Sequence, residues 1–175
     1  MGIDADFGWA LSGVCWPSHG VVHVGAPWNS YEMAHTIQIT FDAADPYTLG
    51  EFWCEVLGYV REAPPDKETW PEQLEYWGVP VEDWNSRNVI VDPRGNGPRV
   101  FFQRVPEPKT AKNRVHLDVR TAEGLRGDER MEELRGRARQ LCEKGATIFR
   151  EFPPDGVETG FIVMQDPEGN EFCLA

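Results

Sequence analysis

One stretch near the C-terminus determines the fold: Phe161-Ile162-Val163-Met164-Gln165-Asp166-Pro167-Glu168-Gly169-Asn170-Glu171-Phe172-Cys173-Leu174. An apolar strand, a turn and a second apolar strand follow one another in it. Pro presets the turn and Gly or Asn supplies the positive φ, so the stretch predicts a β-hairpin. The same pattern occurs earlier, as Asn88-Val89-Ile90-Val91-Asp92-Pro93-Arg94-Gly95-Asn96 before Arg99-Val100-Phe101-Phe102-Gln103. A hairpin late in each half indicates two copies of one small module.

The segments before the two hairpins also match each other. Residues 35–41 and 114–119 alternate apolar and polar side chains, as half-buried strands do. Asp45-Pro46 and Gly58 predict where the first helix begins and ends, and Gly145 ends the second. Each half therefore predicts the element order βαβββ. The expected fold class is α+β, with two tandem βαβββ modules forming a curved, mixed or antiparallel sheet around a cavity.

The repeat divides the chain into segments. We expect an N-terminal extension at 1–33, a first module at 35–105, a linker at 106–113 and a second module at 114–175. The first module carries an insertion at 64–87 that is rich in Trp, Tyr and Pro. Its rings either cap the core or form an aromatic lid over a ligand cavity.

Composition limits the possible partners and location. The net charge of -12 and the pI of about 4.7 disfavour nucleic acid and anionic membranes as partners. No Lys or Arg precedes Arg61, so the positive segment of a secretory signal is missing, and no apolar run reaches the length of a membrane span. Four cysteines without Cys-x-x-Cys spacing favour a reduced, cytoplasmic protein.

Strand alternation predicts which side chains face away from each module's helix. Their neighbours, including Ile37, Val115 and Leu117, are expected to face the helices. Each module thus has one sheet face that points away from its helix. The two faces, one from each module, could curve together into a cavity. The outward-facing polar set is Gln38, Gln103, His116, Asp118, Glu171 and Cys173.

Three motifs resemble the vicinal oxygen chelate superfamily, which includes glyoxalase I, extradiol dioxygenases, fosfomycin-resistance thiol transferases and bleomycin-resistance proteins. Two of them are Phe-Trp-Cys-Glu-Val-Leu-Gly-Tyr at 52–59 and Asp-Pro-Glu-Gly-Asn-Glu-Phe at 166–172. The third, Phe-Phe-Gln-Arg-Val-Pro-Glu-Pro-Lys at 101–109, resembles the glyoxalase-like subgroup. The resemblance covers residues 35–175.

The resemblance implies four metal-ligand positions, one on each of two strands in each module. They fall at Gln38, Gln103, His116 and Cys173. A divalent Zn, Ni, Fe or Mn ion is what the family pattern suggests. None of the four positions carries a carboxylate, however, which such ions favour, and Asp118 and Glu171 lie two residues away from the matching positions. The residues therefore favour a site without a metal.

Two of these residues have alternative roles. His116 is either a cavity residue that hydrogen-bonds Gln103 or Gln38, or a catalytic general base, because imidazole titrates near neutral pH. Cys173 is either a small buried side chain or a nucleophile that His116 activates. The rings expected to line a ligand pocket are Trp53, Trp77, Trp84 and Phe101.

Three functions stay open at this point. The first is a metal-dependent lyase or isomerase of the glyoxalase type, or an extradiol-type dioxygenase, acting on a small oxygenated substrate. The second is a metal-free protein that sequesters a flat small molecule, in the manner of bleomycin-resistance proteins; the acidic charge balance would suit a cationic ligand. The third is an interaction module without a small ligand. The resemblance also implies a homodimer.

Overall fold

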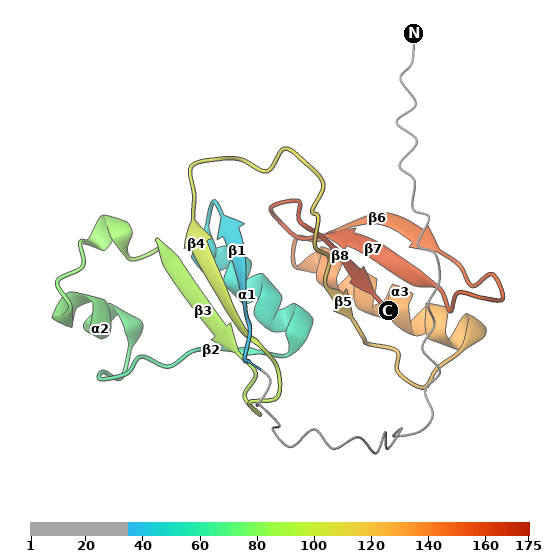
Figure 1. Cartoon of the computed structure of the whole chain (residues 1–175), viewed down its shortest axis with the longest axis horizontal. Helices are drawn as coiled ribbons and strands as arrows, with labels where there is room; N and C mark the ends of the chain where they lie inside the picture. The colour runs from blue at the N-terminus through green and yellow to red at the C-terminus, as the bar shows by residue number, and fades with distance from the viewer. Residues whose placement is uncertain (1–34) are drawn as a thin grey trace, which may run out of the picture.

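The structure is a computed structural model that describes residues 35–175 (Figure 1). The expected extension at 1–33 lies outside the described residues. The first module contains β1 (Gln38–Ala43), α1 (Pro46–Leu57), β2 (Val60–Arg61), α2 (Trp70–Tyr76), a 3-10 helix (Val81–Asp83), β3 (Arg87–Val91) and β4 (Arg99–Arg104). The second contains β5 (Asp118–Val119), α3 (Gly127–Glu143), β6 (Thr147–Phe152), β7 (Phe161–Gln165) and β8 (Glu171–Leu174).

The two modules have the same sheet topology. The strand orders are β1-β4-β3-β2 and β5-β8-β7-β6, and in each sheet the first strand of the module pairs in parallel with its last. The other pairs are antiparallel. Within residues 35–175 the two sheets are not hydrogen-bonded to each other and form no closed barrel. The predicted α+β class with two tandem βαβββ modules is confirmed.

Helix α1 begins and ends where the sequence predicts. The side chain of Asp45 accepts a hydrogen bond from the backbone N–H of Thr48 at 3.1 Å, and Pro46 occupies the first turn. Gly58 ends the helix in the left-handed conformation with φ of 68°, which only glycine adopts without strain. These caps satisfy backbone groups that the helix itself leaves unpaired.

A single apolar core joins the two modules. The rings of Trp53 on α1 and Phe172 on β8 lie 5.2 Å apart, and Phe52 meets Phe172 edge-on at 6.1 Å. The buried residues of α3 complete the core from the other module: Met131, Leu134, Ala138 and Leu141. Burial of this shared apolar surface is the main force holding the modules together.

The starts of the two first strands differ from the prediction. Ile37 and Val115 were expected to face the helices, but their side chains are 70% and 78% exposed. Residues 114–115 form a bend and the strand begins only at Asp118, because the chain is drawn aside at Asn113, whose N–H donates to Glu171 at 3.0 Å. Leu117 does pack against the core, as predicted.

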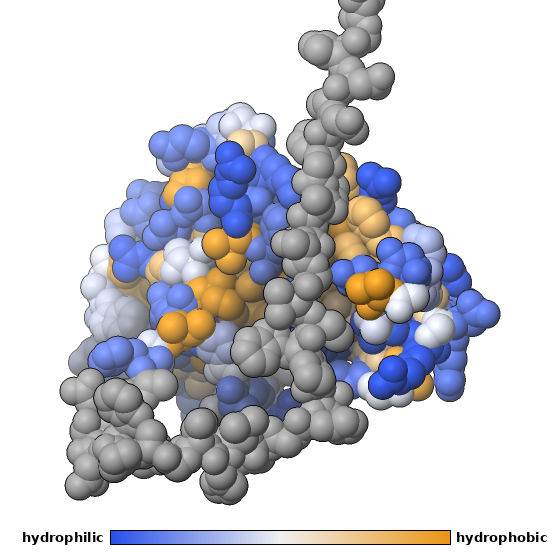
Figure 2. Space-filling view, turned by 45° about the vertical axis from the view of Figure 1, so that its right-hand side comes forward, coloured by the Kyte–Doolittle hydropathy of each residue, from blue (hydrophilic) through white to orange (hydrophobic). Residues whose placement is uncertain are grey.

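Apolar residues interrupt a largely hydrophilic surface, as Figure 2 shows for one face. In the described part of the chain, no helix has the length and apolar character to cross a membrane. The exposed large apolar side chains are Ile37, Tyr47, Val60, Tyr76, Trp77, Val81, Val115, Ile148, Phe149 and Val157.

Candidate functional site

The two Asp-Pro-x-Gly-Asn turns share their internal hydrogen bonds: in each, the aspartate accepts from the N–H groups two, three and four residues on. Asp92 accepts a hydrogen bond from the N–H of Arg94 at 2.9 Å, and Asp166 accepts one from the N–H of Glu168 at 3.0 Å. Each aspartate thus organises its turn by hydrogen-bonding the backbone two residues on. The turns differ in the residue between Pro and Gly, which is basic in the first module and acidic in the second.

Glu168 connects the second turn to the first module. Its two carboxylate oxygens accept hydrogen bonds from the N–H groups of Ala44 and Asp45, at 2.7 and 2.9 Å. These amides lie just before α1, where a negative charge is favoured by the helix dipole. Arg94, at the equivalent place in the first turn, has an 83% exposed side chain. The carboxylate of Glu168 therefore fixes where the second hairpin meets α1.

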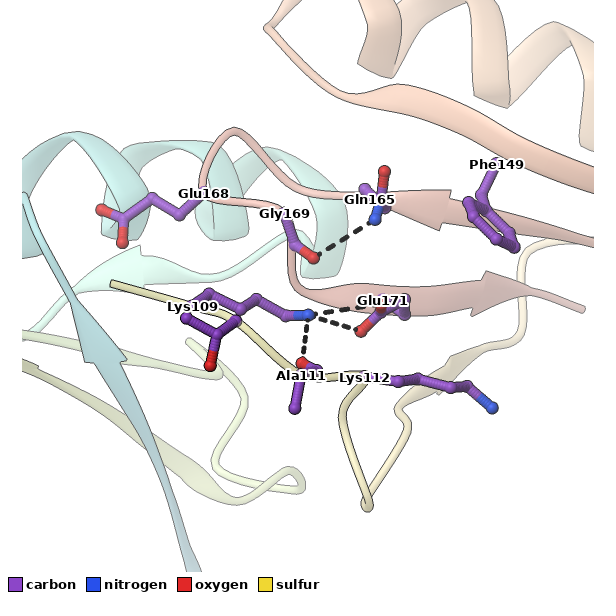
Figure 3. Close-up of a pocket in the computed structure, with 9 residues that line it drawn as sticks. Lys109, Ala111, Lys112, Phe149, Gln165, Glu168, Gly169 and Glu171 are labelled. Atoms are coloured by element: carbon purple, nitrogen blue, oxygen red, sulfur yellow. Dashed lines mark hydrogen bonds and ion pairs between the residues drawn. The ribbon is translucent and has the colours of Figure 1, made fainter. Parts of the chain in front are cut away.

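The linker between the modules is fastened to the second sheet. Lys109 Nζ lies 3.0 Å from a carboxylate oxygen of Glu171 on β8 and donates to the carbonyl oxygen of Ala111 at 2.8 Å (Figure 3). The other end of the linker is held by the same carboxylate, through the N–H of Asn113. We call this arrangement the linker clasp: Lys109, Ala111, Asn113 and Glu171.

A cavity of about 360 Å³ lies between the linker and the second sheet. Figure 3 shows Phe149 at one end of it, Glu168 pointing toward the first module and Lys112 pointing away from Lys109. The linker, the turn after β7 and all three longer strands of the second sheet contribute to its walls. The lining residues are Lys109, Thr110, Ala111, Lys112, Phe149, Gln165, Glu168, Gly169 and Glu171.

The clasp changes the acidity of Glu171. Partial burial raises the pKa of its carboxyl group, but hydrogen bonds from Asn113 and Lys109 favour the charged form and outweigh burial. The net result is a pKa below the ordinary value, so Glu171 is ionised at neutral pH and the clasp is a charge-assisted contact.

Gln38 and Gln103 lie at opposite ends of the β1–β4 pair. Gln38 is opposite Arg99 in register and accepts a hydrogen bond from its guanidinium, which also pairs with Glu62 at 2.7 Å. Gln103 is opposite Asp42 and donates to its carboxylate at 2.8 Å. Four residues along a strand span about 13 Å, so the structure does not bring the two amides together.

His116 lies in the bend before β5. Its Nε2 atom is 2.9 Å from the carbonyl oxygen of Asn113. A carbonyl oxygen only accepts, so Nε2 carries the proton in this contact and donates it. His116 therefore helps to shape the bend, and its Nε2 is not presented as a metal ligand.

Cys173 is buried on β8, opposite Asp118 in register. Burial raises the pKa of its thiol to about 12, and the neighbouring charge of Asp118 acts in the same direction, as does the hydrogen bond between them. A thiol must lose its proton to act as a nucleophile or to bind a metal. With no metal bound, Cys173 is consequently protonated at neutral pH and a poor nucleophile.

The modules place their outward carboxylates at equivalent positions. The N–H of Val105 donates to Ala43 O at 3.0 Å, and the N–H of Ala175 donates to Val119 O at 2.9 Å. Asp42 beside Gln103 therefore corresponds to Asp118 beside Cys173. The predicted ligand set does not follow this symmetry, because it treats Gln38 and His116 as the equivalent positions on the first strands of the two modules.

The four predicted ligand positions do not fit a divalent ion in this arrangement. Gln38 hydrogen-bonds a guanidinium and lies four register positions from Gln103, and Nε2 of His116 donates to a backbone carbonyl. In addition, no three His, Cys, Asp or Glu side chains within residues 35–175 gather as a metal site would require. We derive no step through a metal for this chain.

The rings predicted to line a ligand pocket lie in different surroundings. Trp53 is only 1% exposed and belongs to the core, so its assignment to a pocket is wrong; as a large ring on the buried face of α1 it packs against Phe172. Trp77 is half exposed and contacts Trp70, while Phe101 lies under Arg99. Trp84 lines a second, separate pocket.

The cavity residues were mostly missed by sequence reasoning. Phe149 points outward because β6 is irregular between Ile148 and Arg150, and such a bulge breaks the alternation on which the facing pattern depends. The contact of Lys109 with Glu171 joins residues 62 positions apart, and no local pattern predicts it. Among the cavity residues, Glu171 alone was predicted from the sequence to face away from the helix, because strand alternation places it on that face.

Comparison with known proteins identifies the family but not an activity. The model of the glyoxalase-like domain matches residues 38–175, and no curated protein matches the sequence. The fosfomycin resistance protein FosX of Listeria monocytogenes, solved as a mutant with Mn(II) and 1S,2S-dihydroxypropylphosphonic acid, is similar in structure with a TM-score of 0.53. It is 11% identical over 81% of this chain and 89% of that one.

A second solved structure gives the same picture. FosX of Mesorhizobium loti has a TM-score of 0.51 and 13% identity over 81% of this chain and 90% of that chain. At such identities the likeness shows the fold alone. The family model, by contrast, spans both modules. The chain belongs to the glyoxalase-like domain family, within the vicinal oxygen chelate superfamily.

Proposed function

We propose that this protein binds a small molecule in the cavity beneath the linker clasp, without a divalent metal. The observation that supports this most is the Lys109–Glu171 contact, which holds the linker over the outward face of the second sheet. The cavity volume of about 360 Å³ lies within the range of small-molecule pockets. The activity is thus proposed to be binding or sequestration, as in bleomycin-resistance proteins.

The lining indicates the chemistry of the ligand. Its four charged side chains cancel, with two lysines against two glutamates, although the whole chain carries a net charge of -12. Phe149 offers an aromatic surface, and Gln165 offers both a donor and an acceptor. These features favour a neutral or zwitterionic molecule with one flat apolar part, rather than the strongly cationic ligand that the overall charge suggests.

The metal-dependent alternative has less support. A lyase, isomerase or dioxygenase of this superfamily would hold vicinal oxygens on an ion bound by Gln38, Gln103, His116 and Cys173. The first two lie at opposite ends of a strand pair, and Nε2 of His116 donates to a backbone carbonyl. His116 as a general base without a metal stays a prediction.

The proposal is tested by a fragment screen on the full chain, followed by amide NMR shifts in the presence of EDTA. A ligand of the proposed class should shift the amides of residues 109–112 and 169–171. Phe149→Ala should weaken it several-fold, while Ile148→Ala should not, since Ile148 is equally exposed on the same strand but outside the lining. The proposal would be overturned if binding required an added metal, or if Phe149→Ala left the affinity for the ligand unchanged.

The homodimer is a separate proposal. Support comes from strand β6, which lies at the edge of its sheet and exposes Ile148. Open edge strands with apolar side chains are favourable sites for pairing with another chain. Light scattering of the full chain should give twice the monomer mass, and Ile148→Lys should lower it.

A further inference from the structure

A second pocket lies in the first module, where the aromatic insertion meets the start of α1. Its volume is about 280 Å³, and it shares no lining residue with the cavity beneath the linker. Three aromatic rings and one guanidinium form its walls. The lining residues are Asp45, Tyr47, Thr48, Arg61, Trp70, Pro71, Leu74, Trp84 and Asn85. We call it the Arg61 pocket.

The guanidinium of Arg61 is held between two rings. It lies 4.8 Å from the ring centre of Tyr47 and 5.9 Å from that of Trp70. Its Nε atom donates to the side-chain oxygen of Asn88 at 3.1 Å, which fixes the orientation of the planar group. These three contacts preorganise the charge before any ligand binds.

No protein group among residues 35–175 neutralises this guanidinium. Nε is its only nitrogen with a hydrogen-bond acceptor there, and no carboxylate lies within 4.0 Å of it. The two terminal nitrogens of Arg61 are therefore available to an acceptor from outside the described chain. A half-buried guanidinium without a carboxylate partner is a strong point of attraction for an anion.

Most of the other polar groups of the pocket already have partners. Asp45 accepts hydrogen bonds from Thr48 and from the side chain of Asn85, at 3.1 and 2.7 Å. The indole N–H of Trp70 donates to Glu62 O at 2.7 Å, and that of Trp84 donates to a backbone carbonyl at 2.9 Å. The rings therefore present apolar surface to the pocket, and Arg61 is left as its main unpaired donor.

We propose that the Arg61 pocket binds the carboxylate of a planar aromatic acid. The terminal nitrogens of Arg61 donate two parallel hydrogen bonds to the carboxylate, a geometry in which the two planar groups match. The aromatic part of the ligand packs against Tyr47, Trp70 and Trp84. The negative charge of Asp45 in the same pocket favours a singly charged acid over a phosphate dianion. This inference does not depend on the function proposed for the other cavity.

The probe for this site is 1-naphthoate, compared with the neutral 1-naphthamide and the more highly charged 1-naphthyl phosphate. The indole N–H signals of Trp70 and Trp84, assigned with Trp→Phe variants, report a ring that enters the pocket. The proposal expects saturable shifts of these two signals with 1-naphthoate. Binding of the amide should be at least about tenfold weaker because the charge-assisted hydrogen bonds are lost, and the phosphate should also bind more weakly.

Two arginine variants complete the test. Arg61→Gln should weaken 1-naphthoate binding by at least about tenfold, and Arg61→Lys by less, since a positive charge remains. Arg94→Gln removes an exposed arginine of the same module and should leave the affinity unchanged. An unshifted signal of the buried Trp53 verifies that each variant is folded. Equal binding of acid and amide, equal binding by Arg61→Gln, or no saturable shift would overturn the proposal.

Discussion

The indole N–H of Trp53 on α1 donates a hydrogen bond to a carboxylate oxygen of Asp166 in the second hairpin, at 3.1 Å. Both side chains are buried, and 113 positions separate them in sequence. Burial raises the pKa of Asp166, while hydrogen bonds from Asn170, Trp53 and Glu168 act against it. A contact of this kind fixes one orientation of the two modules, which apolar packing alone does not specify.

Removal of this donor should destabilise the whole chain. Trp53→Phe leaves Asp166 with one partner fewer and opens space in the core, so the free energy of unfolding should fall by about 2–4 kcal/mol. Trp77→Phe is the matched control, because that ring is half exposed, and it should change stability by less than about 0.5 kcal/mol. Urea denaturation measures both; similar values for the two variants would refute the assigned role of Trp53.

The repeated turn provides a second comparison. Glu168→Ala removes the acceptor for two amides at the start of α1 and should cost about 1–2 kcal/mol in urea denaturation. Arg94→Ala changes the equivalent residue of the first turn, whose side chain is exposed, and should cost less than about 0.5 kcal/mol. If the two substitutions were equally costly, the contact between the modules would not be what distinguishes these positions.

The linker clasp should open in acid. The pKa of Glu171 lies below its ordinary value near 4.5 in the folded chain, so its stabilising contribution is complete above that pH and is lost as the pH falls through the folded pKa. The amide proton of Asn113, which donates to Glu171, should report this as an NMR transition with a midpoint below 4.5. Glu171→Gln should abolish the transition; a midpoint above 4.5 would contradict the assigned contact.

The cysteines should differ in reactivity. At pH 8 the thiolate fraction of Cys173, with a pKa of about 12, is roughly one in ten thousand, and Cys54, with a pKa of about 11, is also protonated. Cys142 is exposed. In a Cys15→Ser background, iodoacetamide should therefore modify Cys142 first, as peptide mass spectrometry would show. Equally fast labelling of Cys173 would reopen its role as a nucleophile or metal ligand.

The sequence predicts the parts of this fold that depend on short-range chemistry. The Asp45 cap, the Gly58 stop and the two hairpin turns follow from neighbouring residues, and the βαβββ repeat follows from those signals. The incorrect predictions concern residues whose positions are set by contacts with distant parts of the chain. Val115 was placed against the helix because nothing local indicates that Glu171, 58 positions beyond Asn113, draws the chain into a bend.

The candidate site shows the same limit. Alternation correctly gives the facing direction of a residue on a regular strand, but not its level along the sheet. Gln38 and Gln103 share an outward face, yet they lie four register positions apart. The closing role of Lys109 likewise depends on where the linker folds, which the sequence of the linker does not specify.

The most direct test is elemental analysis by plasma mass spectrometry of the full, untagged chain, purified without chelator and then offered Zn, Ni, Fe and Mn. We expect far less than one equivalent of any of these metals associated with the positions of Gln38, Gln103, His116 and Cys173, and no change in metal content on His116→Ala. Close to one equivalent of a single metal, lost on His116→Ala, would contradict the proposed metal-free function and favour a metalloenzyme.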